Sequence, residues 1–188
     1  GNSMAPGGHQ IICNKDKGYD TAIVVHKRWQ GRIIKQRPTP EATLVGIRPD
    51  SKHAAAGSSD LFFVSAHLPD QWKGDEFYKA LENMEGLINN NCDPKAEVFL
   101  GMDAHVVGLH GEHGSTSGEA GEGPECLPET SSPEGRKRLD RLGDFMACNN
   151  FETERTGWSH TWRHPNGKTF YRTIDYLAAR NAGKFSCC

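Results

Sequence analysis

The chain has 188 residues, a net charge of −2 and 36% hydrophobic residues, which is the composition of one globular domain of ordinary size. A charge this small excludes a general electrostatic attraction to nucleic acid, so any basic surface has to be local. The sequence contains no run of eighteen apolar residues and no visible signal peptide, so it predicts no membrane span.

The six cysteines are scattered and form neither a zinc ribbon nor a dense disulfide framework. A reducing compartment is therefore the default expectation. The sequence does not determine the location, and an intracellular or nuclear one is compatible with it. The chain begins at Gly1 rather than Met, so we expect it to be a piece of a longer protein.

The first half of the chain predicts an irregular segment followed by strands. Residues 1–17 are mixed and rich in glycine, and we expect them to be irregular. Apolar runs then predict strands at residues 21–26, 43–48 and 61–66, and a fourth at residues 96–100.

A helix is predicted between the last two of these strands, at residues 75–90. Its apolar residues fall on one stripe at helical spacing, and Asp75 is placed to act as the N-cap. The stripe consists of Phe77, Leu81, Met84, Leu87 and Ile88. A helix between two strands is a crossover unit, so we expect both strands in one layer, although a surface helix is also compatible with the pattern.

The following segment changes character. Residues 109–134 are rich in Gly, Ser, Thr and Pro and carry no Lys or Arg, so we expect a long, flexible loop. A second helix is predicted at residues 132–149, with Pro133 in its first turn. Its basic residues are expected on a solvated outer face: Arg136, Lys137, Arg138 and Arg141.

Strands at residues 151–156, 161–162 and 169–177 complete the predicted domain. Asn166-Gly167 is a type I′ hairpin signal between the last two. The mixture of strands and helices predicts an α+β or α/β layered fold in which helices cover a mixed sheet.

Polar side chains follow two neighbouring predicted strands. Asp103 and His105 come directly after one strand, and His67 ends the strand before it. Residues two apart in an extended backbone point to the same side, so Asp103 and His105 could face one substrate or one metal. The alternatives are an ordinary polar turn and a structural histidine at the surface.

Two further candidates are weaker. Asp175 interrupts an apolar strand, where it either faces solvent or has a cationic partner, because a buried carboxylate without one is costly. His105, His110 and His113 together with Asp103 could hold zinc, but the last two histidines lie in the loop and not on a helix with fixed geometry.

Three sequence motifs resemble the endonuclease/exonuclease/phosphatase superfamily in order and spacing. They are SAHLPD at residues 65–70, FLGMDAH at residues 99–105 and TWRHPNGKTFYRTIDYLAAR at residues 161–180. Gly135-Arg136 and the helix that runs to Phe151 are most similar to the endonuclease domain of non-long-terminal-repeat retrotransposon proteins, which also carry a reverse transcriptase. The resemblance covers residues 18–180, leaving residues 181–188 as a tail.

The resemblance implies an incomplete four-layered α/β sandwich of the deoxyribonuclease-like type, with mixed sheets flanked by helices. It also implies hydrolysis of DNA phosphodiester bonds with Mg²⁺, or Mn²⁺ as the alternative. Asp103 matches the carboxylate that activates water and holds metal, and His105 replaces an Asn that contacts phosphate or metal. His67 matches a histidine at the scissile phosphate, and Asp175 matches a carboxylate that polarises a catalytic histidine.

Contacts to DNA are expected near the end of the chain. The residues that we expect to bind the substrate are Thr161, Trp162, Arg163 and Arg172. Past Thr156 the chain carries five Lys or Arg residues against the single acid Asp175, and a basic surplus of this kind suits phosphates. By itself it would be an ordinary solvated surface.

The sequence also departs from the family pattern. The N-terminal strand with its metal-site Asn, the Gln-Glu motif and the closing Ser-Asp-His motif have no match here. The chain is therefore either an endonuclease-like hydrolase or a catalytically dead remnant that acts as a binding or structural module. A phosphatase or a nuclease for another phosphoester is a third reading, and the oligomeric state is not predicted.

Overall fold

The computed structural model describes residues 2–14, 21–49, 60–69, 75–106, 133–153, 160–163, 169–172 and 175–182, with the backbone alone for residues 160–163 and 169–172. Most of the expected loop at residues 109–134 lies outside these ranges. No helix within them has the length and apolar composition of a membrane span.

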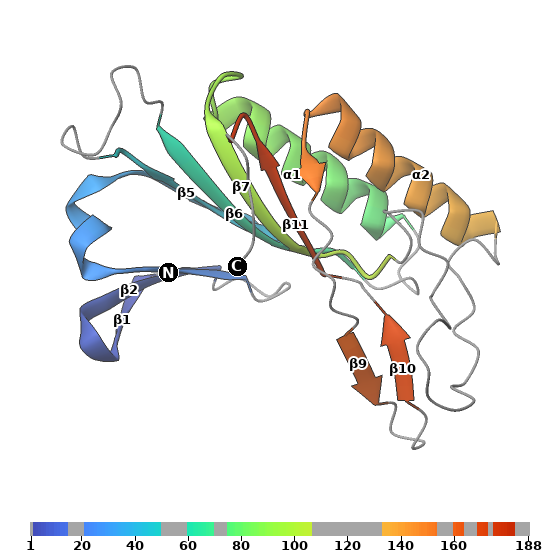
Figure 1. Ribbon diagram of the computed structural model, residues 1–188, viewed down its shortest axis with the longest axis horizontal. Coiled ribbons are helices and arrows are strands. Elements are labelled where there is room, and N and C mark those ends of the chain that lie inside the picture. Colours follow the sequence, from blue (N-terminus) through green and yellow to red (C-terminus); the bar gives the residue numbers. More distant parts are fainter. Residues whose placement is uncertain are drawn as a thin grey trace.

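The largest element is a six-stranded mixed sheet (Figure 1). Its order is β4-β5-β6-β7-β11-β8, and all neighbours are antiparallel except the parallel pair β6 and β7. The strands are β4 Ile33–Pro38, β5 Ala42–Ile47, β6 Leu61–His67, β7 Glu97–Asp103, β11 Asp175–Arg180 and β8 Glu152–Thr153.

Two helices cover one face of this sheet, α1 Glu76–Asn91 and α2 Pro133–Cys148 (Figure 1). The helix α1 joins β6 to β7, so the predicted crossover is confirmed, and both helices begin and end close to the expected residues. Asp75 is the N-cap residue of α1, as expected, and its carbonyl accepts the Lys79 N–H at 3.2 Å, but its side chain makes no capping hydrogen bond.

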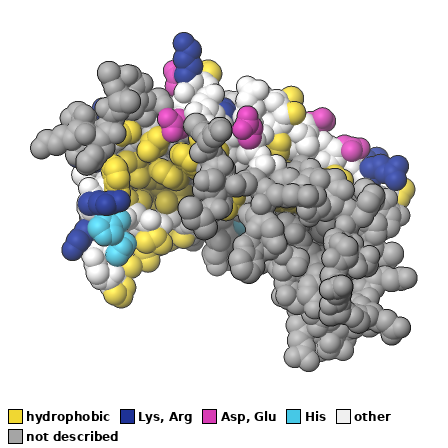
Figure 2. Space-filling view, in the orientation of Figure 1, with side chains coloured by type: hydrophobic (Ala, Val, Ile, Leu, Met, Phe, Trp, Pro, Cys, Tyr) yellow, Lys and Arg dark blue, Asp and Glu magenta, His cyan; other side chains and the backbone are white. Residues whose placement is uncertain are grey.

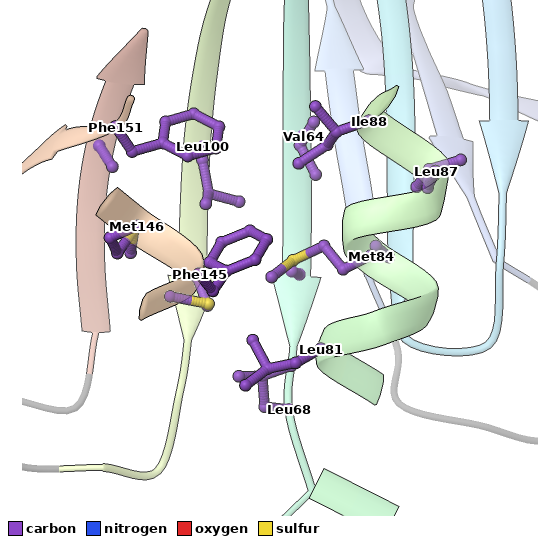
Figure 3. Packing of buried hydrophobic residues seen from close by; sticks show 14 of the residues in the cluster. Val64, Leu68, Leu81, Met84, Leu87, Ile88, Leu100, Phe145, Met146 and Phe151 are labelled. Atoms are coloured by element: carbon purple, nitrogen blue, oxygen red, sulfur yellow. The ribbon is translucent and has the colours of Figure 1, made fainter. Parts of the chain in front are cut away.

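The core lies between the helices and the sheet (Figure 3). Alternate residues of β6 and β7 face the helices, because successive strand side chains point to opposite sides. Met84 and Phe145 from the two helices are fully buried against this face. Cys92 is also buried there, and burial raises the pKa of its thiol to about 11, so it packs as a neutral side chain at pH 7.

A three-stranded sheet packs against the other face of the large sheet. It consists of β1 Asn2–Ala5, β2 His9–Cys13 and β3 Ala22–Val25. Ile12 and Val25 of this sheet form a second cluster with Val45 and Ile47 of β5. Figure 2 shows hydrophobic side chains gathered beside basic and histidine side chains on the face turned to the viewer.

The described residues thus form three layers: helices, a mixed sheet and a second sheet. The predicted mixed α/β class is confirmed. The expectation that residues 1–17 are irregular is wrong for the described part, which forms β1 and β2 with the short 3-10 helix Pro6–Gly8 between them. A second short 3-10 helix, Lys27–Arg32, precedes β4.

The end of the chain differs from its prediction. The single strand expected at residues 169–177 is two strands, β10 Thr169–Arg172 and β11. The strand β10 pairs with β9 His160–Arg163 as an antiparallel ribbon apart from the main sheet, in agreement with the expected hairpin (Figure 1). Its turn at Asn166-Gly167 lies outside the described residues.

Candidate active site

The strands β6 and β7 end, and β11 begins, at the same edge of the main sheet. In the parallel pair, His67 of β6 lies beside Asp103 of β7. In the antiparallel pair, Asp175 of β11 lies beside the same Asp103. Neighbours such as Ala66, Met102 and Tyr176 are buried on the helix face, so the three polar residues share the other face.

Two imidazole rings and one carboxylate meet at this point. The Nε2 atoms of His67 and His105 are 3.0 Å apart, and the ring centroids are 5.1 Å apart. Asp103 Oδ2 lies 3.9 Å from His67 Nε2 and 3.5 Å from His105 Nε2. We call His67, Asp103 and His105 the triad. Among the described residues it is a group with the spacing to hold a metal ion.

The backbone fixes the place of each triad residue. The His67 N–H donates to the carbonyl of Glu41 at 2.9 Å, and the Leu68 N–H donates to the carbonyl of Asp103 at 2.8 Å. The His105 N–H donates to Asp103 Oδ1 at 3.3 Å, so this oxygen belongs to a local turn and Oδ2 is the one closer to the rings. Hydrogen bonds therefore connect the end of β6 to the end of β7 and to the turn that carries His105.

His105 has a positive φ of 50°. This left-handed conformation is uncommon outside glycine, although histidine is among the residues enriched there. A strained backbone conformation persists only where the surrounding structure stabilises it, and such conformations are over-represented at functional sites. Here it turns the chain directly after β7, so the His105 ring comes back to the carboxylate of Asp103.

Tyr176 supports the segment after His105, and sequence reasoning did not select it. Its hydroxyl donates to the carbonyl of Val106 at 2.7 Å, and the side chain is buried. The sequence feature that could have indicated Tyr176 is its position next to Asp175 in the third motif. Tyr176 thus connects β11 to the turn that carries His105.

The predicted site residues divide into three groups. The structure brings His67, Asp103 and His105 together, and it places Asp175 next to Asp103 with an exposed side chain. Thr161, Trp162, Arg163 and Arg172 lie in the ribbon β9–β10, whose side chains are outside the description. His110 and His113 also lie outside the described residues, so that zinc set stays a prediction.

Comparison with known proteins identifies the fold. No protein-family model and no curated protein sequence matches the chain. Solved structures do match. A humanised TDP2 of D. rerio carrying 14 mutations has 12% sequence identity and a TM-score of 0.50, over 95% of this chain and 63% of that one.

Two other structures agree. The D. rerio TDP2 complexed with a single-strand DNA product matches at 12% identity and a TM-score of 0.50, over 95% of this chain and 64% of that one. A β-hairpin deletion mutant of the Staphylococcus aureus beta toxin matches at 12% identity and a TM-score of 0.50, over 90% of this chain and 59% of that one. The chain thus spans less than two thirds of each protein.

The chain has the deoxyribonuclease I-like fold. This is the fold of the endonuclease/exonuclease/phosphatase structures, as the three sequence motifs predicted. In this fold, the triad lies where β6 and β7 end side by side in parallel, and the ends of neighbouring parallel strands are where open α/β sheets place their ligands.

Proposed function

We propose that the chain is a divalent-metal-dependent hydrolase of DNA phosphodiester bonds. The observation that carries the proposal is the triad, which brings a carboxylate and two imidazoles together at the ends of β6 and β7 in a deoxyribonuclease-like sheet. The D. rerio TDP2 structure with a DNA product shows that this fold accommodates a DNA strand in that protein.

The donor atoms of the site fit a divalent cation. Mg²⁺ and Mn²⁺ accept carboxylate oxygens, and Mg²⁺ needs only one or two of them because it retains several waters. Asp103 supplies one such oxygen, and Asp175, its neighbour across β7 and β11, offers another. When bound, such a cation neutralises the charge that develops on the phosphoryl oxygens and makes water more acidic.

The protein's own side chains have separate roles in the proposal. Asp103 orients the attacking water and accepts its proton, which requires an ionised carboxylate within hydrogen-bond reach. His67 and His105 donate ring N–H groups to the phosphate oxygens. Each triad side chain is 26–32% exposed, so all three are partly accessible from solvent.

The ribbon β9–β10 is the proposed contact to DNA. It carries Thr161, Trp162, Arg163 and Arg172, and arginine suits phosphate because its N–H groups bind two oxygens at once. We further propose that the endonuclease-like domain expected over residues 18–180 also includes β1 and β2, because Ile12 of β2 packs with Val45 and Ile47 of β5. We also propose that the domain is an endonuclease of the type found in non-long-terminal-repeat retrotransposon proteins, because its motifs follow the same order.

Nicking of supercoiled plasmid tests the function. We expect the wild-type chain to convert supercoiled to open-circular DNA with Mg²⁺ or Mn²⁺ and to lose this activity with EDTA. Asp103→Ala should lower the rate at least about 100-fold, because it removes both the base and a metal ligand. The matched control is Asp140→Ala, which changes an exposed carboxylate on α2, on the other side of the sheet.

Equal nicking by Asp103→Ala and wild type would assign the activity to a contaminant and refute the proposal. A wild-type chain that shifts DNA in a gel but never cleaves it, with either metal, would also refute hydrolysis. That second result would favour the binding module that the missing sequence motifs suggest.

A further inference from the structure

The triad offers two nitrogen atoms and one oxygen atom toward one point. His67 Nε2 lies 3.0 Å from His105 Nε2 and 3.9 Å from Asp103 Oδ2, and His105 Nε2 lies 3.5 Å from Asp103 Oδ2. Ligand atoms that lie about 2.0–2.1 Å from a tetrahedral zinc ion are about 3.4 Å apart. The three atoms therefore already have the spacing of three ligands around one ion.

We propose that the triad is a binding site for a divalent transition-metal ion such as Zn²⁺, with His67, His105 and Asp103 as its three ligands. The inference concerns the same side chains as the proposed hydrolysis but does not depend on it, because metal binding is measured without substrate. The two proposals assign the rings different roles: with Mg²⁺ on the carboxylates the ring N–H groups contact the phosphate, whereas with Zn²⁺ bound both Nε2 atoms would be metal ligands.

The donor chemistry separates this ion from Mg²⁺. Mg²⁺ prefers oxygen ligands, whereas imidazole nitrogen suits Zn²⁺ and the neighbouring first-row metals. Two of the three triad donors are imidazole nitrogens, and His105 is one of them. Two histidines and a carboxylate with a fourth position open to water or substrate form a known pattern of catalytic zinc sites.

The site is held in this arrangement before any ion arrives. Asp103 Oδ1 accepts the N–H of His105, which leaves Oδ2 for the metal. The His67 backbone is anchored on Glu41, and Tyr176 holds the carbonyl of Val106, one residue past His105. A site whose ligands are positioned by the fold loses little conformational entropy when it binds.

In the metal-free chain, a hydrogen bond between the two rings also explains the contact between His67 and His105. One ring N–H donates to the lone pair of the other ring, which accounts for the 3.0 Å separation of the two Nε2 atoms. An ion would replace this hydrogen bond and accept lone pairs from both nitrogens. If the triad is a metal site, zinc affinity depends on all three side chains. If the contact is only a hydrogen bond between the rings, it does not.

Isothermal titration calorimetry of the full chain tests the proposal. We expect one equivalent of Zn²⁺ to bind at least about 100-fold more tightly than Mg²⁺. His67→Gln, His105→Asn and Asp103→Asn should each weaken that equivalent by at least about 100-fold, since even an outer partner of a ligand is worth about 10- to 100-fold. The matched control is His26→Gln, an exposed histidine that bonds the Arg28 N–H, which should leave it unchanged.

The result that overturns the proposal is a Zn²⁺ affinity that none of the three triad variants changes. A spectrum of wild-type protein loaded with Co²⁺ gives a second readout that does not depend on how the variants fold. A four-coordinate nitrogen and oxygen site predicts visible absorption without a thiolate charge-transfer band. A strong thiolate band would place the ion on cysteines and would contradict the proposal. Retained zinc binding without nicking would refute the hydrolase function alone.

Discussion

At the scale of single residues, Arg138 shows how far a side chain can depart from its pattern. Its neighbours in the sequence suggest a solvated basic face, yet Arg138 is only 2% exposed. Its guanidinium lies 4.3 Å from the centre of the Phe77 ring, and Nη2 donates to the carbonyl of Pro69 at 3.0 Å. The expectation that Arg138 is solvated is therefore wrong.

Arg138 connects α2 to α1 and to Pro69, which lies two residues past His67 at the end of β6. We expect Arg138→Ala to lower the free energy of unfolding by about 3 kcal/mol, because it removes a desolvated cation–π contact and a charged hydrogen bond. Urea denaturation followed by circular dichroism measures the change. Lys137→Ala, at the exposed neighbouring position, should change it by less than about 0.5 kcal/mol. Similar losses in both variants would contradict this account of Arg138.

At the scale of elements, two glycines have opposite expected effects. Gly46 lies in β5, where a Cβ would come 2.8 Å from Phe62 Cε1 and 3.3 Å from Ile34 Cγ1. Gly143 lies in α2, and a Cβ there meets nothing within 4 Å. The first glycine is required by close packing between strands, whereas the second leaves the helix more flexible than alanine would.

We therefore expect Gly46→Ala to destabilise the protein by about 1–3 kcal/mol, as overpacking of a buried ring does. Gly143→Ala should stabilise it by about 1 kcal/mol, because alanine has the higher helix propensity. Thermal unfolding of the two variants beside wild type measures both. An increase in stability for Gly46→Ala would show that β5 and β6 are packed more loosely than the structure has them.

The elements themselves were predictable where burial imposes a period on the sequence. The strands β6 and β7 and the helix α1 each have an apolar pattern that their burial explains. The strand β1 has no such pattern because all but one of its residues are exposed, and it exists through its pairing with β2. Similarly, β4 carries Lys35, Gln36 and Arg37 at the edge of the sheet, where charged side chains are common.

At the scale of the whole molecule, the candidate site follows from topology. A crossover helix makes β6 and β7 parallel neighbours, and this alone brings His67 beside Asp103, which is 36 positions later in the sequence. The sequence therefore predicted this pair. It also offered a zinc set of His105, His110 and His113 with Asp103. The structure brings His105 and Asp103 together, and the other two histidines lie outside the described residues, so that set stays a prediction.

The relation of Asp175 to the site was only partly predictable. Its motif indicated a functional carboxylate, and the structure places it next to Asp103 in the sheet with an exposed side chain. Which strands flank β11 depends on the antiparallel return of the chain end, and no local pattern encodes that return. The catalytic and DNA-binding roles stay proposals, and they depend on the triad being assembled in solution.

Nuclear Overhauser spectroscopy of the histidine rings tests that assembly most directly. With resonances assigned through His67→Gln and His105→Gln, the account predicts cross peaks between the ring protons of His67 and His105, whose ring centroids are 5.1 Å apart. Each substitution should remove them, and His26→Gln should not. If neither ring shows a cross peak to the other, while each shows cross peaks to different neighbours, then β6 and β7 do not form a common site.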